Sequence, residues 1–373
     1  MIWLARVVAL LLALLPLRAA PEPVASPASA DTAEALETLR QRHDLPALAV
    51  VVVKDGKICD RAAVGVRKAG DPTPVTVDDQ FHIGSCTKSM TATLAALLIE
   101  EGKLRWNTTV AEVFPELKGK IDRQYEAVTL EQLLTHRGGC PSEPPAAAWS
   151  RAWQQRGTPT QQRSEFIQAV LALPPQAAPG TEFIYSNQGY TVAGAMLERI
   201  TGKPWETLMT EKVFRPLGMK SAGFGVPGTP GRVDQPWGHV REGGSLQPVQ
   251  KDNPQAIGPA GTVHCSLDDL ARYLIAHLQR GPSGGLLKRE TFRRLHTPPS
   301  GQEYACGWLS VDRPWARGKA LTHAGSNTMW YLVLWLAPER NFAVAVATNV
   351  AGSDAEEGCD EVAAAMVGKW LGQ

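Results

Sequence analysis

The chain has 373 residues, with 38 Lys or Arg against 37 Asp or Glu, so its formal net charge is +1. No block of like charge stands out, and this balance argues against nucleic acid and anionic membrane surfaces as partners. Hydrophobic residues make up 44% of the chain, which is typical of a folded core. The length predicts two lobes, or one domain with a large insertion.

The first 30 residues have the pattern of a secretory signal peptide. Arg6 precedes an apolar run over 7–17, and small residues follow, including an A-x-A sequence at 28–30. The run is short for a membrane span, although an uncleaved N-terminal anchor is the alternative interpretation. We therefore expect residues 1–30 to form a signal peptide cleaved somewhere between 19 and 30. The mature protein would be secreted or periplasmic, without a stable membrane span.

The next predicted elements are a helix, a hairpin and a second helix. Apolar residues recur at helical spacing in the first helix, and an Asp-Gly pair marks the turn of the hairpin. Gly102 stands at a natural end of the second helix. The predicted bounds are 31–43 for the first helix, 47–53 and 58–66 for the strands, and 85–101 for the second helix.

The middle of the chain is predicted to be mostly helical. Its helices are short apolar segments bounded by Pro and Gly, and Thr129 stands at an N-cap position. Two segments, 141–163 and 221–260, lack a clean periodicity. We expect an irregular loop or short helices in the first, and loops with a short hairpin in the second. The predicted helices are 129–134, 164–173, 189–200 and 205–214.

Strands return near the C-terminus. Because strands then lie at both ends of the mature chain, we predict an α/β (α+β) fold with one sheet built from both ends. In this division 31–104 and 261–373 form the lobe with the sheet, and 105–260 form an inserted helical lobe. The predicted elements are helices 266–278, 291–295 and 354–371, and strands 304–311, 319–322, 329–337 and 342–348.

Six scattered cysteines allow 15 pairings, and the sequence does not choose among them. Disulfides in an oxidising compartment and buried free thiols are both open. There is no CxxC, no HExxH and no close Cys/His cluster, so we expect neither a metal nor another cofactor. The cysteines are Cys59, Cys86, Cys140, Cys265, Cys306 and Cys359.

Three short motifs carry candidate chemistry. In the first, Ser85 and Lys88 stand three residues apart at the start of an apolar helix, so their hydroxyl and amine can share a proton. Unpaired N–H groups at a helix start favour the oxyanion that a nucleophilic serine produces. The alternative is a helix-capping serine beside a surface lysine. The other two motifs, in order along the chain, are Tyr185-Ser186-Asn187 and His323-Ala324-Gly325.

With these motifs, over about residues 35–371, the chain resembles the serine β-lactamase and penicillin-binding-protein superfamily. It is most similar to the branch that holds class C β-lactamases, D,D-peptidases and esterases. Phrases such as 133–136, 185–190 and 214–219 support the resemblance. The resemblance implies a β-lactamase/transpeptidase-like fold, with an antiparallel sheet flanked by helices.

The resemblance also implies roles. Ser85 would be the nucleophile that becomes acylated, Lys88 would act on its proton, and Tyr185 would be the other member of the acid–base pair. A phenol beside a lysine cation favours its phenolate form, so the two groups influence each other's pKa. Whether lysine or tyrosine is the primary base is left open. The implied substrate-binding and oxyanion residues are Asn187, His323, Gly325 and Ser326, the last through its backbone N–H together with that of Ser85.

His323 departs from the class C pattern, which usually has a lysine that helps to hold a substrate carboxylate. A histidine is a weaker, pH-dependent cation. This lowers the support for a dedicated β-lactamase and leaves peptidase, esterase and amidase activities open. Three other histidines are interpreted as structural hydrogen-bonding residues: His82, His136 and His264.

We therefore expect an exported serine hydrolase that acts through an acyl-enzyme on an amide or ester. Its substrate would be a small molecule or peptide, such as a β-lactam, a D-Ala-D-Ala peptide or a small ester. The alternative is a non-catalytic relative that binds or senses penicillin or peptidoglycan. The choice of substrate depends on the loops 141–163 and 221–260, whose conformation cannot be predicted from the sequence.

Overall fold

The computed structural model describes residues 29–279 and 285–372. The predicted signal peptide, apart from its last two residues, therefore lies outside the described residues. Among the helices of the described ranges, none is long and apolar enough to cross a membrane.

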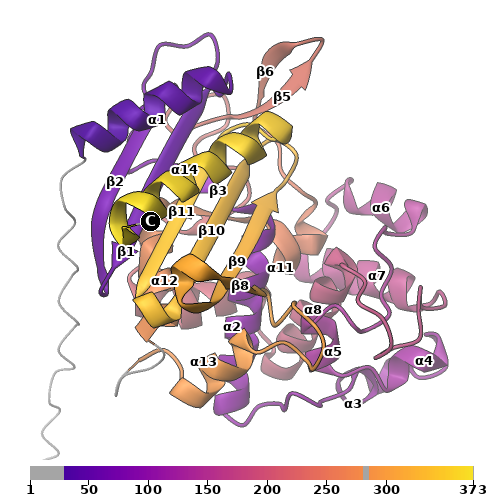
Figure 1. The fold of residues 1–373 in the computed structure, drawn as a ribbon. Helices are drawn as coiled ribbons and strands as arrows, with labels where there is room; N and C mark the ends of the chain where they lie inside the picture. The colour runs from indigo at the N-terminus through magenta and orange to yellow at the C-terminus, as the bar shows by residue number, and fades with distance from the viewer. Residues whose placement is uncertain (1–28, 280–284, 373) are drawn as a thin grey trace, which may run out of the picture.

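A six-stranded antiparallel sheet forms the centre of the molecule, in the order β2-β1-β11-β10-β9-β8 (Figure 1). Strand β1, from the N-terminal part, pairs directly with β11, and Val51 lies opposite Ala345. This confirms the predicted sheet built from both ends of the chain. The strands are β1 Ala47–Lys54, β2 Lys57–Gly65, β8 Leu309–Arg313, β9 Gly318–Ser326, β10 Tyr331–Ala337 and β11 Phe342–Thr348.

Both faces of this sheet are covered by helices, which explains the continuous apolar run of β1. Val50 and Val52 pack on one face with helices α1 (Ala30–Arg42) and α14 (Ser353–Leu371), which Figure 1 shows lying across the strands. Because successive side chains alternate, Val51 packs on the other face, which α12 (Leu267–Gln279) covers. The central helix α2 (Thr87–Glu100) lies in the same core cluster as Val51.

Two smaller β-structures lie outside this sheet. One is a three-stranded sheet in the order β3 (Gln80–His82), β7 (Val263–Ser266) and β4 (Gly223–Phe224). Strand β3 leads directly into the turn before α2. The other is the hairpin β5 (Gly238–Glu242) with β6 (Ser245–Val249), as expected for the 221–260 segment.

The middle of the chain is mostly helical, and two of its helices differ from the predicted bounds. Helix α7 begins at Pro159, five residues early, because Thr158 and Gln161 form a capping box that we did not identify. The helix predicted over 205–214 divides into α9 and a π-helical turn, Thr210–Phe214. The helices are α3 Val110–Val113, α4 Arg123–Glu126, α5 Leu130–Leu134, α6 Ala146–Ala152, α7 Pro159–Leu171, α8 Asn187–Thr201, α9 Trp205–Met209, α10 Arg215–Leu217, α11 Gly258–Gly261 and α13 Arg289–His296.

All six cysteines are free thiols, and five of them are buried. The structure therefore selects the second of the two possibilities that the sequence left open. Burial raises the pKa of the Cys86 thiol beside Ser85, so this thiol stays protonated and acts as a small apolar side chain.

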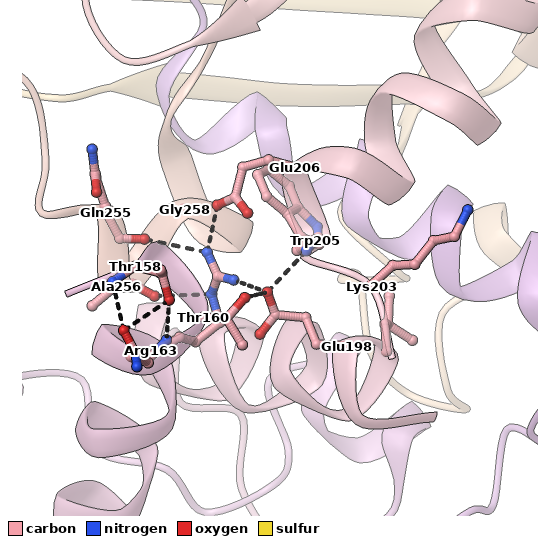
Figure 2. A network of polar contacts seen from close by, with 12 residues as sticks. Thr158, Thr160, Arg163, Glu198, Lys203, Trp205, Glu206, Gln255, Ala256 and Gly258 are labelled. Atoms are coloured by element: carbon pink, nitrogen blue, oxygen red, sulfur yellow. Dashed lines mark hydrogen bonds and ion pairs between the residues drawn. The ribbon is translucent and has the colours of Figure 1, made fainter. Parts of the chain in front are cut away.

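A buried arginine ties the helical part together (Figure 2). Arg163 of α7 is 0% exposed and pairs with two carboxylates, Glu198 of α8 and Glu206 of α9, the latter at 2.7 Å. Its Nε also donates to the Ala256 carbonyl at 3.2 Å. Glu198 accepts further hydrogen bonds from the Thr160 hydroxyl and the Trp205 backbone N–H.

This network also anchors the backbone that leads to the site described below. Ala256 belongs to the 3₁₀ turn Gln255–Ile257, which runs directly into α11. The Pro259 ring of α11 packs directly on the backbone of α8 at Gly194, where an added Cβ would lie 2.2 Å from Pro259 Cγ. The position of α11 therefore depends on Arg163 and on Gly194.

Arg163→Met should lower the free energy of unfolding by about 3–5 kcal/mol, because it leaves the buried carboxylate of Glu198 and the half-buried carboxylate of Glu206 without their cation. Denaturant unfolding monitored by circular dichroism measures this. Arg199→Met, which breaks the exposed Arg199–Glu116 pair, is the control and should cost less than about 1 kcal/mol. Equal costs for the two variants would contradict the anchoring role of Arg163.

Candidate active site

Ser85 lies in the 3₁₀ turn Gly84–Cys86, immediately before α2. This turn is pressed against the end of strand β9. A Cβ on Gly84, whose φ is +49°, would lie 2.2 Å from Ser326 N, and one on Gly325 would lie 2.0 Å from Ile83 O. Only glycine permits such an approach of two backbones. The two glycines therefore let the serine turn and the strand edge meet.

Lys88 is 0% exposed, and its ammonium nitrogen lies among three oxygens. Nζ lies 2.9 Å from Ser85 Oγ, 2.7 Å from Asn187 Oδ1 and 2.9 Å from the carbonyl oxygen of Ala260. Burial lowers the pKa of Lys88 from 10.5 to about 7, because it disfavours the charged form. The amine is thus close to half-protonated at neutral pH.

Tyr185 lies beside these groups, in the segment that leads into α8. Its ring centroid is 4.8 Å from Lys88 Nζ, and its hydroxyl is near enough to the Ser85 side chain for that group to influence its pKa. The residue is 37% exposed, so it forms part of an open wall of the site. Burial raises the pKa of Tyr185, an effect that the Ser85 side chain only partly offsets. This raised pKa favours the protonated phenol over the phenolate.

Asn187 is the first residue of α8, and its neighbour Ser186 caps the helix by accepting from Gly189 N. The backbone N–H of Ser186 donates to Nδ1 of His136 at 3.0 Å. These two bonds fix the start of α8, and with it the amide that contacts Lys88. His136 thus has the hydrogen-bonding role that we inferred from the sequence.

The His136 ring is at the centre of an aromatic cluster that closes one side of the site. Burial lowers its pKa well below the usual value, with smaller contributions from nearby Lys88 and His323, so the ring is neutral. Tyr190 and Tyr304 also belong to this wall, and no motif in the sequence indicates them. The rings around His136 are Phe183, Tyr185, Tyr190 and Tyr304, at centroid distances of 5.7, 4.4, 5.1 and 4.7 Å.

His323 is not the weak cation that the sequence suggested. It is 5% exposed; its Nδ1 donates to the Ala324 carbonyl, so Nε2 accepts from the Tyr304 hydroxyl at 3.0 Å. Burial lowers the pKa of His323 to about 4, and the positive charge of Lys88 contributes. The ring is therefore neutral at physiological pH and has both nitrogens engaged. It supports the wall of the site and carries no charge for a substrate carboxylate.

The structure brings all seven sequence-predicted residues into one region. Ser85, Lys88 and Asn187 are joined by the contacts of Nζ, and Tyr185 borders them. A Cβ on Gly325 would lie 2.8 Å from Ser85 N, which places the Ser326 end of β9 against the same turn. His323 lies behind the Tyr185 ring, at 6.4 Å between centroids. A fixed serine with an adjacent buried amine and backbone N–H groups can perform acyl transfer.

The fold and the arrangement of these residues are those expected of proteins that transfer acyl groups through a serine. Comparison with known proteins shows the family. The family model described as Beta-lactamase matches residues 32–367, and the chain belongs to this family. Penicillin-binding protein 4 of Amycolatopsis lactamdurans is 27% identical over 331 residues, which cover 85% of this chain and 84% of the relative.

Solved structures share the fold. The octameric penicillin-binding protein homologue from Pyrococcus abyssi is 26% identical, with a TM-score of 0.74 over 91% of this chain and 77% of that one. D-alanine carboxypeptidase AmpC from Burkholderia cenocepacia is 22% identical, with a TM-score of 0.73 over 90% of this chain and 98% of that one. At that identity the second likeness shows the fold alone. The predicted fold class is confirmed.

The low pKa of Lys88 predicts a pH-dependent stability. Between about pH 7 and pH 10 the unfolded lysine binds a proton that the folded one lacks, so stability should rise with pH by about 1.4 kcal/mol per unit. Lys88→Met removes this titration. In denaturant unfolding experiments, the free energy of unfolding of wild type should therefore rise relative to that of Lys88→Met as the pH rises from 7 to 9. Lys103→Met, which removes an exposed ammonium, is the control; parallel curves for Lys88→Met and wild type would contradict the shifted pKa.

Proposed function

We propose that this protein is a serine hydrolase that cleaves an amide or ester through an acyl-enzyme on Ser85. The observation that carries the proposal is the position of Lys88 Nζ, fully buried and 2.9 Å from Ser85 Oγ. A lysine placed only for stability has no reason to be buried beside a hydroxyl without a carboxylate partner. Burial of this amine costs stability, and what it provides is a base at neutral pH.

The contacts of Nζ suit proton exchange with Ser85. Asn187 Oδ1 and the Ala260 carbonyl only accept hydrogen bonds, so they hold two N–H groups of the lysine. The third partner, the Ser85 hydroxyl, can either donate or accept. A neutral amine therefore accepts the Ser85 proton through its lone pair, and an ammonium donates it back without any movement. Lys88 is the general base in this proposal.

Tyr185 serves as the general acid. Its raised pKa keeps the phenol protonated, and its hydroxyl lies at Ser85, where a leaving group departs. In the acylation step, Ser85 Oγ bonds to the substrate carbonyl carbon while its proton passes to Lys88. The bond to the leaving group then breaks as Tyr185 supplies a proton, which Lys88 can restore. In deacylation, water attacks the acyl carbon while its proton passes through Tyr185 to Lys88. The bond from the acyl carbon to Ser85 Oγ then breaks as Lys88 returns a proton to Oγ, which releases the acid and restores the free enzyme.

The backbone N–H groups of Ser85 and Ser326 form the oxyanion hole in this proposal. The close contact between the Gly84 turn and the Gly325 strand supports it, because it holds both peptide groups at the nucleophile. Two donors aimed at the developing oxyanion stabilise the tetrahedral intermediate. We also propose that the protein is exported, to a secreted or periplasmic location, as the N-terminal sequence suggests.

The proposed substrate is a small molecule or peptide: a D-Ala-D-Ala peptide, a β-lactam or an ester. The name of the Amycolatopsis relative supports a penicillin-reactive serine. The neutral His323 ring removes one cation that could hold a substrate carboxylate. The neutral ester is therefore the first substrate to test.

A fluorophosphonate or a penicillin should add once to wild type, at Ser85, in intact-mass and peptide measurements. Ser85→Ala should show no adduct, whereas Cys86→Ala should react as wild type does, because its thiol is a buried packing group. The rate should rise about tenfold per pH unit below pH 7 and level off above it, as Lys88 loses its proton. Labelling at Cys86, or none with either reagent, would contradict the proposal.

Turnover separates a hydrolase from a non-catalytic penicillin or peptidoglycan binder. Wild type is expected to hydrolyse at least one of p-nitrophenyl acetate, a chromogenic cephalosporin and a D-Ala-D-Ala peptide. Lys88→Met should lower kcat by about 10²–10⁴-fold, as expected for loss of a general base. A stable Ser85 adduct with no release on any of the three would favour the binder.

A further inference from the structure

A buried histidine lies two residues before the serine turn and is bonded to it. His82, the last residue of β3, is 0% exposed, and its Nδ1 accepts the Gly84 backbone N–H at 3.1 Å. Because Nδ1 accepts, the ring proton is on Nε2, which lies 2.8 Å from Asp252 Oδ1. This contact does not have the geometry of a hydrogen bond, so we describe it as an electrostatic contact.

The same carboxylate oxygen reaches the opposite segment of the site. Asp252 Oδ1 accepts from Asn327 Nδ2 at 3.0 Å and from the Asn253 backbone N–H at 2.6 Å. Asn327 is 3% exposed and directly follows Ser326. Its Oδ1 accepts from Met329 N at 3.2 Å, which closes the turn after β9.

We propose that His82, Asp252 and Asn327 are positioning residues for the oxyanion hole. This inference rests on the proposed function. Asp252 Oδ1 contacts both His82 and Asn327. His82 accepts the backbone N–H of Gly84, which precedes Ser85, and Asn327 follows Ser326. One carboxylate oxygen therefore links the neighbours of the two proposed oxyanion donors.

The physical need for such a connection follows from what the two donors must do. An N–H group that is kept for an oxyanion has no partner of its own in the free enzyme, so it must be oriented by its neighbours. The two donors come from segments about 240 residues apart in sequence, 85 and 326. A single charged acceptor between them fixes their relative position, and neither glycine at the contact has a side chain that could do so.

The test compares variants that break or keep the bonds. His82→Leu and Asn327→Ala remove them, whereas His82→Gln keeps one acceptor and one donor. Phenylboronic acid is the probe, since its tetrahedral adduct on Ser85 directs an oxygen into the hole. We expect the first two variants to lower kcat on p-nitrophenyl acetate by about 10- to 100-fold, less than removal of a whole donor in a characterised serine protease. KM should stay within about threefold, and boronate affinity should fall by the same factor as kcat.

His239→Leu is the matched control, because His239 is also 0% exposed and bonded on both nitrogens, to Ala69 N–H and the Asn349 carbonyl. It should keep wild-type kcat and boronate affinity. Recovery of kcat by His82→Gln supports positioning, and that variant remains informative if His82→Leu does not fold. Folded His82→Leu and Asn327→Ala with wild-type kcat and boronate affinity would overturn the inference while Ser85 labelling upholds the hydrolase. A wild type without a Ser85 adduct would instead overturn the proposed function.

Discussion

The chemistry that we propose for this protein depends on a lysine amine kept out of water. Lys88 Nζ has no carboxylate among its hydrogen-bond partners in the described structure; it has a hydroxyl, a side-chain amide oxygen and a backbone carbonyl. Neutral oxygens stabilise an ammonium less than water and a counter-ion do, so burial dominates and the pKa falls to about 7. Most of the architecture serves to hold those three oxygens in place.

Each of the three comes from a different part of the fold. Ser85 and Lys88 share the start of α2, Asn187 begins α8, and Ala260 belongs to α11, which the Arg163 network anchors. The buried ion pairs of Arg163 and the close Gly194–Pro259 contact thus help to position an oxygen that contacts the proposed base, Lys88. Rigid support matters here, because small displacements of a catalytic group cost much of its effect.

Much of the fold and of the site could be predicted from the sequence, and what was missed has a physical reason. The three motifs, at 85–88, 185–187 and 323–325, consist of side chains that can be recognised in the sequence, and the structure brings those side chains together. The Ala260 carbonyl was missed because a backbone acceptor leaves no motif. His323 was misjudged as a cation, because its neutrality depends on burial against Tyr304, a tertiary contact. The start of α7 was missed because the capping box of Thr158 and Gln161, with Pro159 at the first helical position, was not identified.

The most direct test of this account is the pKa of Lys88 itself. Wild-type protein labelled with ¹³C at the lysine Cε positions can be titrated by NMR, with Lys88→Met identifying the resonance. The account predicts a resonance that titrates near pH 7, well apart from those of exposed lysines. A Lys88 resonance that stays in the ammonium form up to about pH 10, as an ordinary lysine does, would contradict it.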